Sequence, residues 1–216
     1  MSNNANSSTP VRRRAGRPSG SDREQNLRRI LDAALVSFAS KGYAGANFAD
    51  IGKAVGFTRS ALYQYFPNKQ ALYHALLEDI QGQHITAVQA IMADDGSFQE
   101  QLERILAVFV ADHEFDFHRS TFLAATPMEL KRHPELVEGS QVEDTVLSLL
   151  LDFFQQAIDT GEIVDRYSAE DLLLALLGGL LGMSLFQHST GMGSVTRAND
   201  AILAMLGGRF LANADT

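Results

Sequence analysis

Apolar residues recur at helical spacing along most of the chain. The first series falls at positions i, i+3, i+4, i+7, i+8 and i+11, which lie on one face of an α-helix: Leu27, Ile30, Leu31, Ala34, Leu35 and Phe38. Lys41-Gly42 ends this helix. No segment alternates with the period of two that is typical of strands, and no internal repeat is visible. The pattern therefore predicts an all-α protein of about nine or ten helices.

Capping residues set the boundaries of the helices that follow. Asn47 begins a second helix, which Gly56 breaks, and Thr58 begins a short third helix that ends near Tyr65. Asn68 follows Pro67 and begins a fourth. The same reasoning predicts further helices over about 97–110, 118–132, 140–159, 168–188 and 195–211.

Composition excludes several classes of function. The 216 residues include no cysteine, which removes disulfides, cysteine-zinc sites and cysteine nucleophiles. No secretory signal is visible, and the longest apolar run, 172–183, is shorter than the ~18 residues of a membrane span. Residues 1–20 are rich in Ser, Asn, Pro, Gly and Arg and are predicted to be disordered. We therefore expect a cytoplasmic protein with no membrane partner, no metal and no cofactor.

Charge is distributed unevenly along the chain. The net charge is -8, but residues 1–80 carry 11 basic and 6 acidic side chains, whereas residues 81–216 carry 7 and 20. A basic end on an acidic body is expected where that end meets a polyanion such as nucleic acid. The alternative is that the two parts are merely solvated differently.

The segment around Gly56 has the dimensions of a helix-turn-helix. Gly52 is small enough to let two helices approach closely, and the third helix presents a polar face whose side chains suit a DNA major groove: Thr58, Arg59, Ser60, Tyr63 and Gln64. Lys69 opposes the dipole of the fourth helix, which is reasonable if a phosphate binds at that helix N-terminus. The alternative is an ordinary helical corner in which the tyrosines pack.

The residues around this turn resemble a known DNA-binding signature. The stretch "FADIGKAVGFTRSALYQYFPNKQAL" (48–72) resembles the DNA-binding signature of TetR-family transcriptional repressors, in the Gly56 turn, the Leu62-Tyr63 and Tyr65-Phe66 pairs, and Lys69 three residues after Phe66. The resemblance covers about residues 22–80. It departs from the family at Gly52, where alanine is commoner, and at Asn47, where threonine is commoner.

This resemblance implies a homodimer that binds a palindromic DNA operator and releases it when a small-molecule effector binds. It implies three parts: a basic arm (1–20), a helix-turn-helix domain (21–67) and a helical ligand-binding and dimerisation domain (68–216). The arm segment "RRRAGRP" resembles minor-groove arms, although it could equally be a solubilising tail. The expected DNA contacts are Arg12, Arg13, Arg14, Arg17, Asn47, Thr58, Arg59, Ser60, Tyr63, Gln64, Tyr65 and Lys69.

The C-terminal part offers candidates for an effector pocket. An apolar cavity is expected to be lined by Phe109, His113, Phe117, Phe122 and Met128, although such a stripe is also typical of plain core. His113, Glu114 and His118 lie close together at helical spacing, so the alternative function is a helical enzyme or metal-binding protein. No HExxH motif supports that alternative. A third possibility is a helical partner-binding module that never touches DNA.

The run "LLLALLGGLLGMSLF" (172–186) is apolar nearly all round, which an exposed helix of a monomer does not tolerate. Together with the helix over 142–158 it is expected to form a four-helix dimer interface, in which two glycines four residues apart allow close approach. The alternative is packing within one chain. The expected interface residues are Val146, Leu150, Phe153, Gly178, Gly182 and Leu185.

Overall fold

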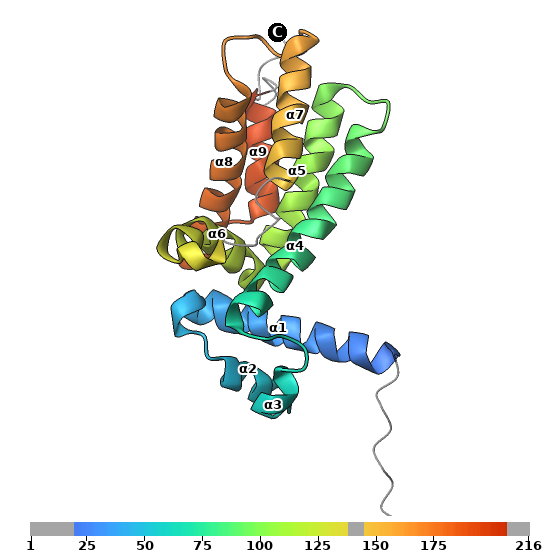
Figure 1. Cartoon of the computed structure of the whole chain (residues 1–216). Coiled ribbons are helices and arrows are strands. Elements are labelled where there is room, and N and C mark those ends of the chain that lie inside the picture. Colours follow the sequence, from blue (N-terminus) through green and yellow to red (C-terminus); the bar gives the residue numbers. More distant parts are fainter. Residues whose placement is uncertain (1–19, 138–144, 207–216) are drawn as a thin grey trace, which may run out of the picture.

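The structure, a computed structural model, describes residues 20–137 and 145–206 (Figure 1). Every regular element in that part of the chain is helical, which confirms the all-α prediction. The elements are α1 (Gly20–Gly45), α2 (Phe48–Ala54), α3 (Arg59–Leu62), α4 (Lys69–Met92), α5 (Phe98–Phe115), α6 (Phe117–Arg132), the 3-10 helix η1 (Pro134–Leu136), α7 (Thr145–Asp159), α8 (Ala169–Thr190) and α9 (Val195–Leu206).

The predicted helix caps are present. The side-chain oxygen of Asn47 accepts the N–H of Ala49 at 2.8 Å, and that of Asn68 accepts the N–H of Ala71 at 2.7 Å. Thr58 caps α3, but this helix is shorter than predicted. It ends at Leu62 because the N–H of Tyr65 bonds to the carbonyl three residues earlier, at 3.0 Å, and so tightens the chain into turns.

Two hydrophobic cores share helix α4. The lower core joins α1, α2, α3 and the first half of α4, and it also takes Phe122 from α6 and Leu136 from η1. The upper core joins the second half of α4 with α5, α7, α8 and α9. Figure 1 shows α6 lying between the two groups of helices. Because α4 is continuous through both cores, the domain boundary at 67/68 remains a prediction.

Helix α8 has an unusually exposed apolar surface. Among the described residues it is the one helix long and apolar enough to cross a membrane, yet only 17% of its apolar window is buried. Leu174, Leu185 and Phe186 are 73%, 64% and 58% exposed. A Cβ added at Gly178 or Gly182 would meet no described atom within 4 Å. The face that carries these residues is therefore left uncovered by residues 20–137 and 145–206.

Helix α7 differs from the expectation for a dimer interface. Its predicted interface residues all lie in the chain's own upper core, with exposed fractions of 8% or less: Val146, Leu150 and Phe153. The apolar stripe of this helix packs against α8 and α4 of the same chain. The alternative of packing within one chain therefore describes Val146, Leu150 and Phe153, whereas α8 carries the more exposed apolar side chains.

Lys69 ties the fourth helix to the end of the first. Its ammonium donates hydrogen bonds to the carbonyls of Tyr43, Ala44 and Ala46 at 2.6, 3.4 and 3.2 Å. These carbonyls lack helical partners because α1 ends there, after the non-helical backbone of Gly42 (φ 67°, ψ 175°). The ammonium thus satisfies backbone groups that a buried helix end would otherwise leave unpaired.

We therefore expect Lys69→Met to lower the free energy of unfolding by about 1–3 kcal/mol, because three carbonyls lose a charged donor. Urea denaturation measures this change. The matched control is Lys53→Met at an exposed position of α2, which should change stability by less than about 0.5 kcal/mol. Equal effects of the two substitutions would contradict the structural role of Lys69.

Candidate nucleic-acid interface and ligand cavity

The turn between α2 and α3 is tight, and two glycines make it so. Gly56 has a positive φ of 78°, a conformation that glycine adopts without strain. A Cβ at Gly52 would lie 3.3 Å from a methyl of Leu62 and 3.4 Å from the carbonyl oxygen of Phe57. The N–H of Phe57 donates to the carbonyl of Gly52 at 2.8 Å. Gly52 therefore lets α3 lie directly against α2, as the sequence predicted.

The exposed face of α3 and its flanks carries the polar side chains predicted to read DNA. All five of these side chains are exposed: Thr58, Arg59, Ser60, Tyr63 and Gln64. The guanidinium of Arg59 donates to the hydroxyl of Tyr63 at 3.2 Å and lies 5.6 Å from the centre of its ring. That hydrogen bond raises the pKa of Arg59. Arg59 and Tyr63 are four residues apart, so they lie on the same side of the helix and present their hydrogen-bond donors to the solvent together.

Other predicted DNA contacts lie in different surroundings. Tyr65 is half-buried, and its ring stacks on Phe57 with centroids 5.7 Å apart. Asn47 is exposed, but its side-chain oxygen is occupied by the helix cap. The ammonium of Lys69 has three carbonyl partners for its three protons, so it has no proton left for a phosphate and the expected phosphate contact gives way to a structural role. The predicted arm contacts lie outside the described residues: Arg12, Arg13, Arg14 and Arg17.

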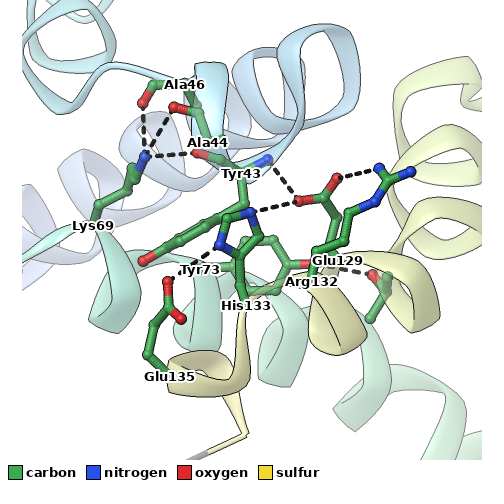
Figure 2. A network of polar contacts seen from close by, with 10 residues as sticks. Tyr43, Ala44, Ala46, Lys69, Tyr73, Glu129, Arg132, His133 and Glu135 are labelled. Atoms are coloured by element: carbon green, nitrogen blue, oxygen red, sulfur yellow. Dashed lines mark hydrogen bonds and ion pairs between the residues drawn. The ribbon is translucent and has the colours of Figure 1, made fainter.

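A polar network joins the end of α6 to the end of α1 (Figure 2). The carboxylate of Glu129 accepts the backbone N–H of Tyr43 at 3.1 Å, and its oxygens lie 3.7 Å from His133 and 3.9 Å from Arg132. Glu129 is only 13% exposed. Because Gly42 interrupts the helix just before Tyr43, that N–H points away from α1 and is free to bond to α6. Sequence reasoning missed this contact, since its two ends are 86 residues apart.

The same network continues on its other side to α4. The second nitrogen of His133 lies 3.2 Å from the carboxylate of Glu135. Burial lowers the pKa of Lys69, and the carboxylates of Glu135 and Glu129 oppose that shift. Burial also raises the pKa of Tyr43, with a further contribution from Glu135. These groups fix the connection between α6 and η1 against the lower core.

A cavity of about 500 Å³ opens between α4, α5, α6, α7 and α8. Its walls are mostly aliphatic and aromatic: Leu77, Gln81, His84, Phe109, Leu123, Thr126, Pro127, Leu130, Lys131, Val137, Val146, Leu147, Leu177, Leu180 and Leu181. This volume is in the range of small-molecule sites, ~300–1,000 Å³. The side chain of Thr126 takes part both in this wall and in a hydrogen bond to Tyr73, at 3.3 Å. Burial raises the pKa of Tyr73 to about 12.

The structure places one predicted pocket residue, Phe109, in the cavity wall. Phe122 instead lies in the lower core beside Tyr73, with ring centroids 5.0 Å apart. Phe117 and Met128 are 50% and 51% exposed and are absent from the wall. The error arose because α6 turns a different face to the cavity, the one with Leu123, Thr126, Pro127 and Leu130. The side chain of His113 is outside the described residues.

The alternative based on His113, Glu114 and His118 gains no support from the described part of the chain. No group of three His, Asp or Glu side chains there is placed to hold a metal ion. The side chains of His113 and Glu114 lie outside the described residues. His118 is partly buried, and its ring packs edge-on against Phe117 at 5.5 Å.

Known proteins share both the turn and the helical frame. Residues 30–76 match the model of the family "Bacterial regulatory proteins, tetR family". These residues form a TetR-family DNA-binding domain. The chain is 33% identical over 134 residues to the transcriptional regulator EthR of Mycolicibacterium smegmatis, a match that spans 60% of this chain and 58% of EthR. It is 29% identical to CymR of Pseudomonas putida over 170 residues, 73% of this chain and 76% of CymR.

A solved structure matches the fold of this chain over most of its length. It is that of AibR in complex with isovaleryl coenzyme A and operator DNA, with a TM-score of 0.68 and 19% identity. The match covers 83% of this chain and 97% of AibR. The likeness therefore extends through the helices that surround the cavity.

The exposure of Arg59 leads to a test on DNA. We expect Arg59→Ala to weaken binding to a selected DNA site by about 1–3 kcal/mol and to relax the preference at one base pair, because a bidentate base contact is lost. Fluorescence anisotropy on a labelled duplex measures both. Asp22→Ala, at an exposed acidic position in the first turn of α1, provides a control that should not relax base preference. Unchanged affinity and base preference in Arg59→Ala would exclude Arg59 from the interface.

The buried carboxylate of Glu129 leads to a stability test. Glu129→Ala should lower the free energy of unfolding by about 1–3 kcal/mol, because the N–H of Tyr43 loses its acceptor. Glu129→Gln should cost less, since an amide oxygen can still accept that N–H. Chemical denaturation of both variants measures the difference. A loss as large in Glu129→Gln as in Glu129→Ala would show that charge, rather than the hydrogen bond to Tyr43, sets the stability.

Proposed function

We propose that this chain is a repressor that binds a palindromic DNA operator as a homodimer and leaves it when a small-molecule effector occupies the cavity. The observation that carries the proposal is the exposed polar face of α3 behind the tight turn at Gly56, on the same chain as an apolar cavity. The short helix is the element that enters the major groove in a helix-turn-helix. A basic segment at residues 12–17 precedes this unit in the sequence and is proposed to reach the minor groove.

The exposed face of α8 is proposed to hold the two subunits together. Leu174, Leu185 and Phe186 present apolar surface there, and Gly178 and Gly182 leave room for a second helix to approach. Apolar patches of this kind on soluble proteins mark interaction sites. A dimer also explains a palindromic site, since two recognition helices about 34–36 Å apart reach successive turns of the major groove.

The contacts of α6 suggest how occupancy of the cavity reaches the DNA-binding unit. One face of α6 lines the cavity through Thr126 and Leu130, and Glu129 on the same helix holds the N–H of Tyr43. Just beyond α6, the carbonyl of Leu136 lies 2.7 Å from a ring nitrogen of His74 in α4. A ligand that displaces α6 therefore acts on α1 and α4 together. For this to release DNA, the ligand must bind the displaced arrangement more tightly.

AibR supports this reading, because its structure contains both operator DNA and isovaleryl coenzyme A. The curated relatives are also transcriptional regulators, so we propose that this chain acts on DNA in the cytoplasm and catalyses no reaction. The alternative of a helical enzyme or metal-binding protein is not favoured by any contact among the described residues.

In-vitro selection from random duplex DNA tests the proposed function. The expected product is an inverted repeat with half-sites about one helical turn apart, bound with an affinity that falls steeply as salt increases. Enrichment of a single, non-repeated site would contradict a dimeric repressor. Failure to enrich any sequence would contradict DNA binding itself.

The surroundings of Gly182 lead to a test of the dimer. Gly182→Leu should leave the monomer fold intact, or stabilise it by up to about 1 kcal/mol, because no atom of the described residues lies within 4 Å of the new Cβ and leucine favours helix. The same change should weaken the dimer by about 1–3 kcal/mol through overpacking. Sedimentation equilibrium measures the dimer, and circular dichroism checks the fold. A Gly182→Leu protein that stays fully dimeric would place the interface elsewhere.

A further inference from the structure

Helix α3 has little of its own to hold its orientation. It comprises four residues, far fewer than the ~12–15 that an isolated helix needs for stability in water. Of its four side chains, only that of Leu62 is buried. The direction in which Arg59 and its neighbours point therefore depends on the residues that flank the helix and on what those residues contact.

A chain of aromatic and cationic contacts links both flanks of α3 to α1. Phe57 precedes the cap Thr58, and Tyr65 follows the end of the helix. Their rings stack with centroids 5.7 Å apart and planes inclined by 24°. The guanidinium of Arg29 lies 6.0 Å from the centre of the Phe57 ring, and that of Arg23 lies 5.4 Å from the centre of the Tyr65 ring. Both arginines belong to α1, so each ring beside α3 faces a cation on the long first helix.

Arg29 also makes a direct hydrogen bond to the turn. Its Nη2 atom donates to the carbonyl of Val55 at 2.8 Å, a partly buried contact between residues 26 positions apart. Val55 is the C-cap of α2, where carbonyls find no donor further along the helix. The Nη1 atom donates to the side-chain oxygen of Asn26, one turn earlier in α1, at 3.4 Å. Arg29 therefore joins α1 to the turn from which α3 departs.

The shape of an arginine side chain suits this position. Its guanidinium is planar and holds its N–H groups in a fixed fork, so one edge donates to a carbonyl while the face lies over a ring. A lysine ammonium is a point charge on a flexible stem and does not fix both partners at once. The side chain of Arg29 is itself exposed, so its removal opens no cavity in the lower core.

We propose that Arg29 is a positioning residue for DNA recognition: it fixes the angle between α1 and the α2–α3 turn, and thereby the orientation of α3 in the major groove. This proposal rests on the proposed function, in which α3 reads the DNA bases. A reading side chain must lie within about 0.5 Å and 10–20° of its productive geometry. A turn that loses its contact with α1 no longer holds α3 to that tolerance, so base discrimination falls while the contacts to phosphates remain.

Fluorescence anisotropy of Arg29→Met on two labelled duplexes tests the proposal: the duplex selected from random DNA and a scrambled duplex of the same composition. The ratio of the two affinities should fall about fivefold or more, which is the size of one good base contact. Affinity for the scrambled duplex and the salt slope should stay at the wild-type values, because no phosphate contact is lost.

Two results of this titration would overturn the proposal. The first is an affinity ratio within about twofold of wild type, which leaves α3 correctly oriented without Arg29. The second is equal weakening on both duplexes with a salt slope reduced by about one unit, which would make Arg29 a phosphate contact instead.

Arg28→Met is the matched control. Arg28 is adjacent in α1, but its guanidinium pairs with Asp79 of α4 at 2.7 Å rather than with the turn. The variant removes the same charge from the same helix, so the affinity ratio should keep its wild-type value. A fall as large as in Arg29→Met would show that charge on α1, and not the contact with the turn, sets discrimination.

Arg29→Lys separates geometry from charge. It keeps the positive charge but not the planar fork, so the affinity ratio should remain low, as in Arg29→Met. Recovery of the wild-type ratio would show that charge suffices and would overturn the positioning role. Circular dichroism checks that each variant is folded, and Arg29→Lys carries the same expectation if Arg29→Met fails to fold.

A measurement without DNA distinguishes failure of this proposal from failure of the proposed function. Hydrogen–deuterium exchange over residues 56–66 should be about tenfold faster in Arg29→Met than in Arg28→Met, because the turn opens more often without the contact to Val55. Equal exchange in the two variants would sink the positioning role whatever the DNA result. Faster exchange without enrichment of any DNA sequence would establish the contact between α1 and the turn, but it would sink the regulator and with it the role in recognition.

Discussion

The hydrogen bond from the backbone N–H of Tyr43 to the carboxylate of Glu129 ties α6, which lines the cavity, to the end of α1. It exists because Gly42 takes a backbone conformation that interrupts α1 and turns the next N–H outward. The carbonyls of the same short segment are held by the ammonium of Lys69. The carboxylate of Glu129 accepts a hydrogen bond from the backbone N–H, and the ammonium of Lys69 donates hydrogen bonds to the backbone carbonyls. The end of α1 is thus held on two sides. Neither group is exposed enough for water to replace it without cost.

The length of α4 turns this local contact into a functional one. The helix runs without a break from Lys69, at the end of α1, to Met92, and its 24 residues span about 36 Å. Gln81 and His84 in its middle line the cavity. A tilt of about 5° around one end of a rod of this length moves the other end by about 3 Å. Such a displacement is large compared with the tolerance of two recognition helices that must enter successive grooves together.

Local signals account for what the sequence could predict. The caps at Asn47 and Asn68 and the close approach at Gly52 depend on residues within a few positions of each other, so they were readable from the chain. The exposed face of α3 followed from the same short-range pattern. The match of residues 30–76 to the family model agrees with that interpretation.

The remaining features depend on which helix faces which, and periodicity does not encode that. Val146 and Phe153 have the pattern of an interface, but the pattern alone cannot say whether the partner is the same chain, as it is here. Phe122 was expected in the cavity and lies in the lower core instead, because α6 turns Thr126 to the cavity wall. The role of Lys69 required its distance to Tyr43, 26 residues away.

The separation of the two DNA-binding units tests the central claim most directly, namely that occupancy of the cavity changes how they are placed. The chain has no cysteine, so Lys53→Cys on the exposed side of α2 allows a single spin label per subunit. Pulsed electron paramagnetic resonance then measures the distance between labels in the dimer. We expect one narrow distribution on operator DNA and a distribution shifted by several ångströms once a small molecule shown to bind in the cavity saturates it. An identical distribution in both conditions, or no distance between subunits at all, would contradict it.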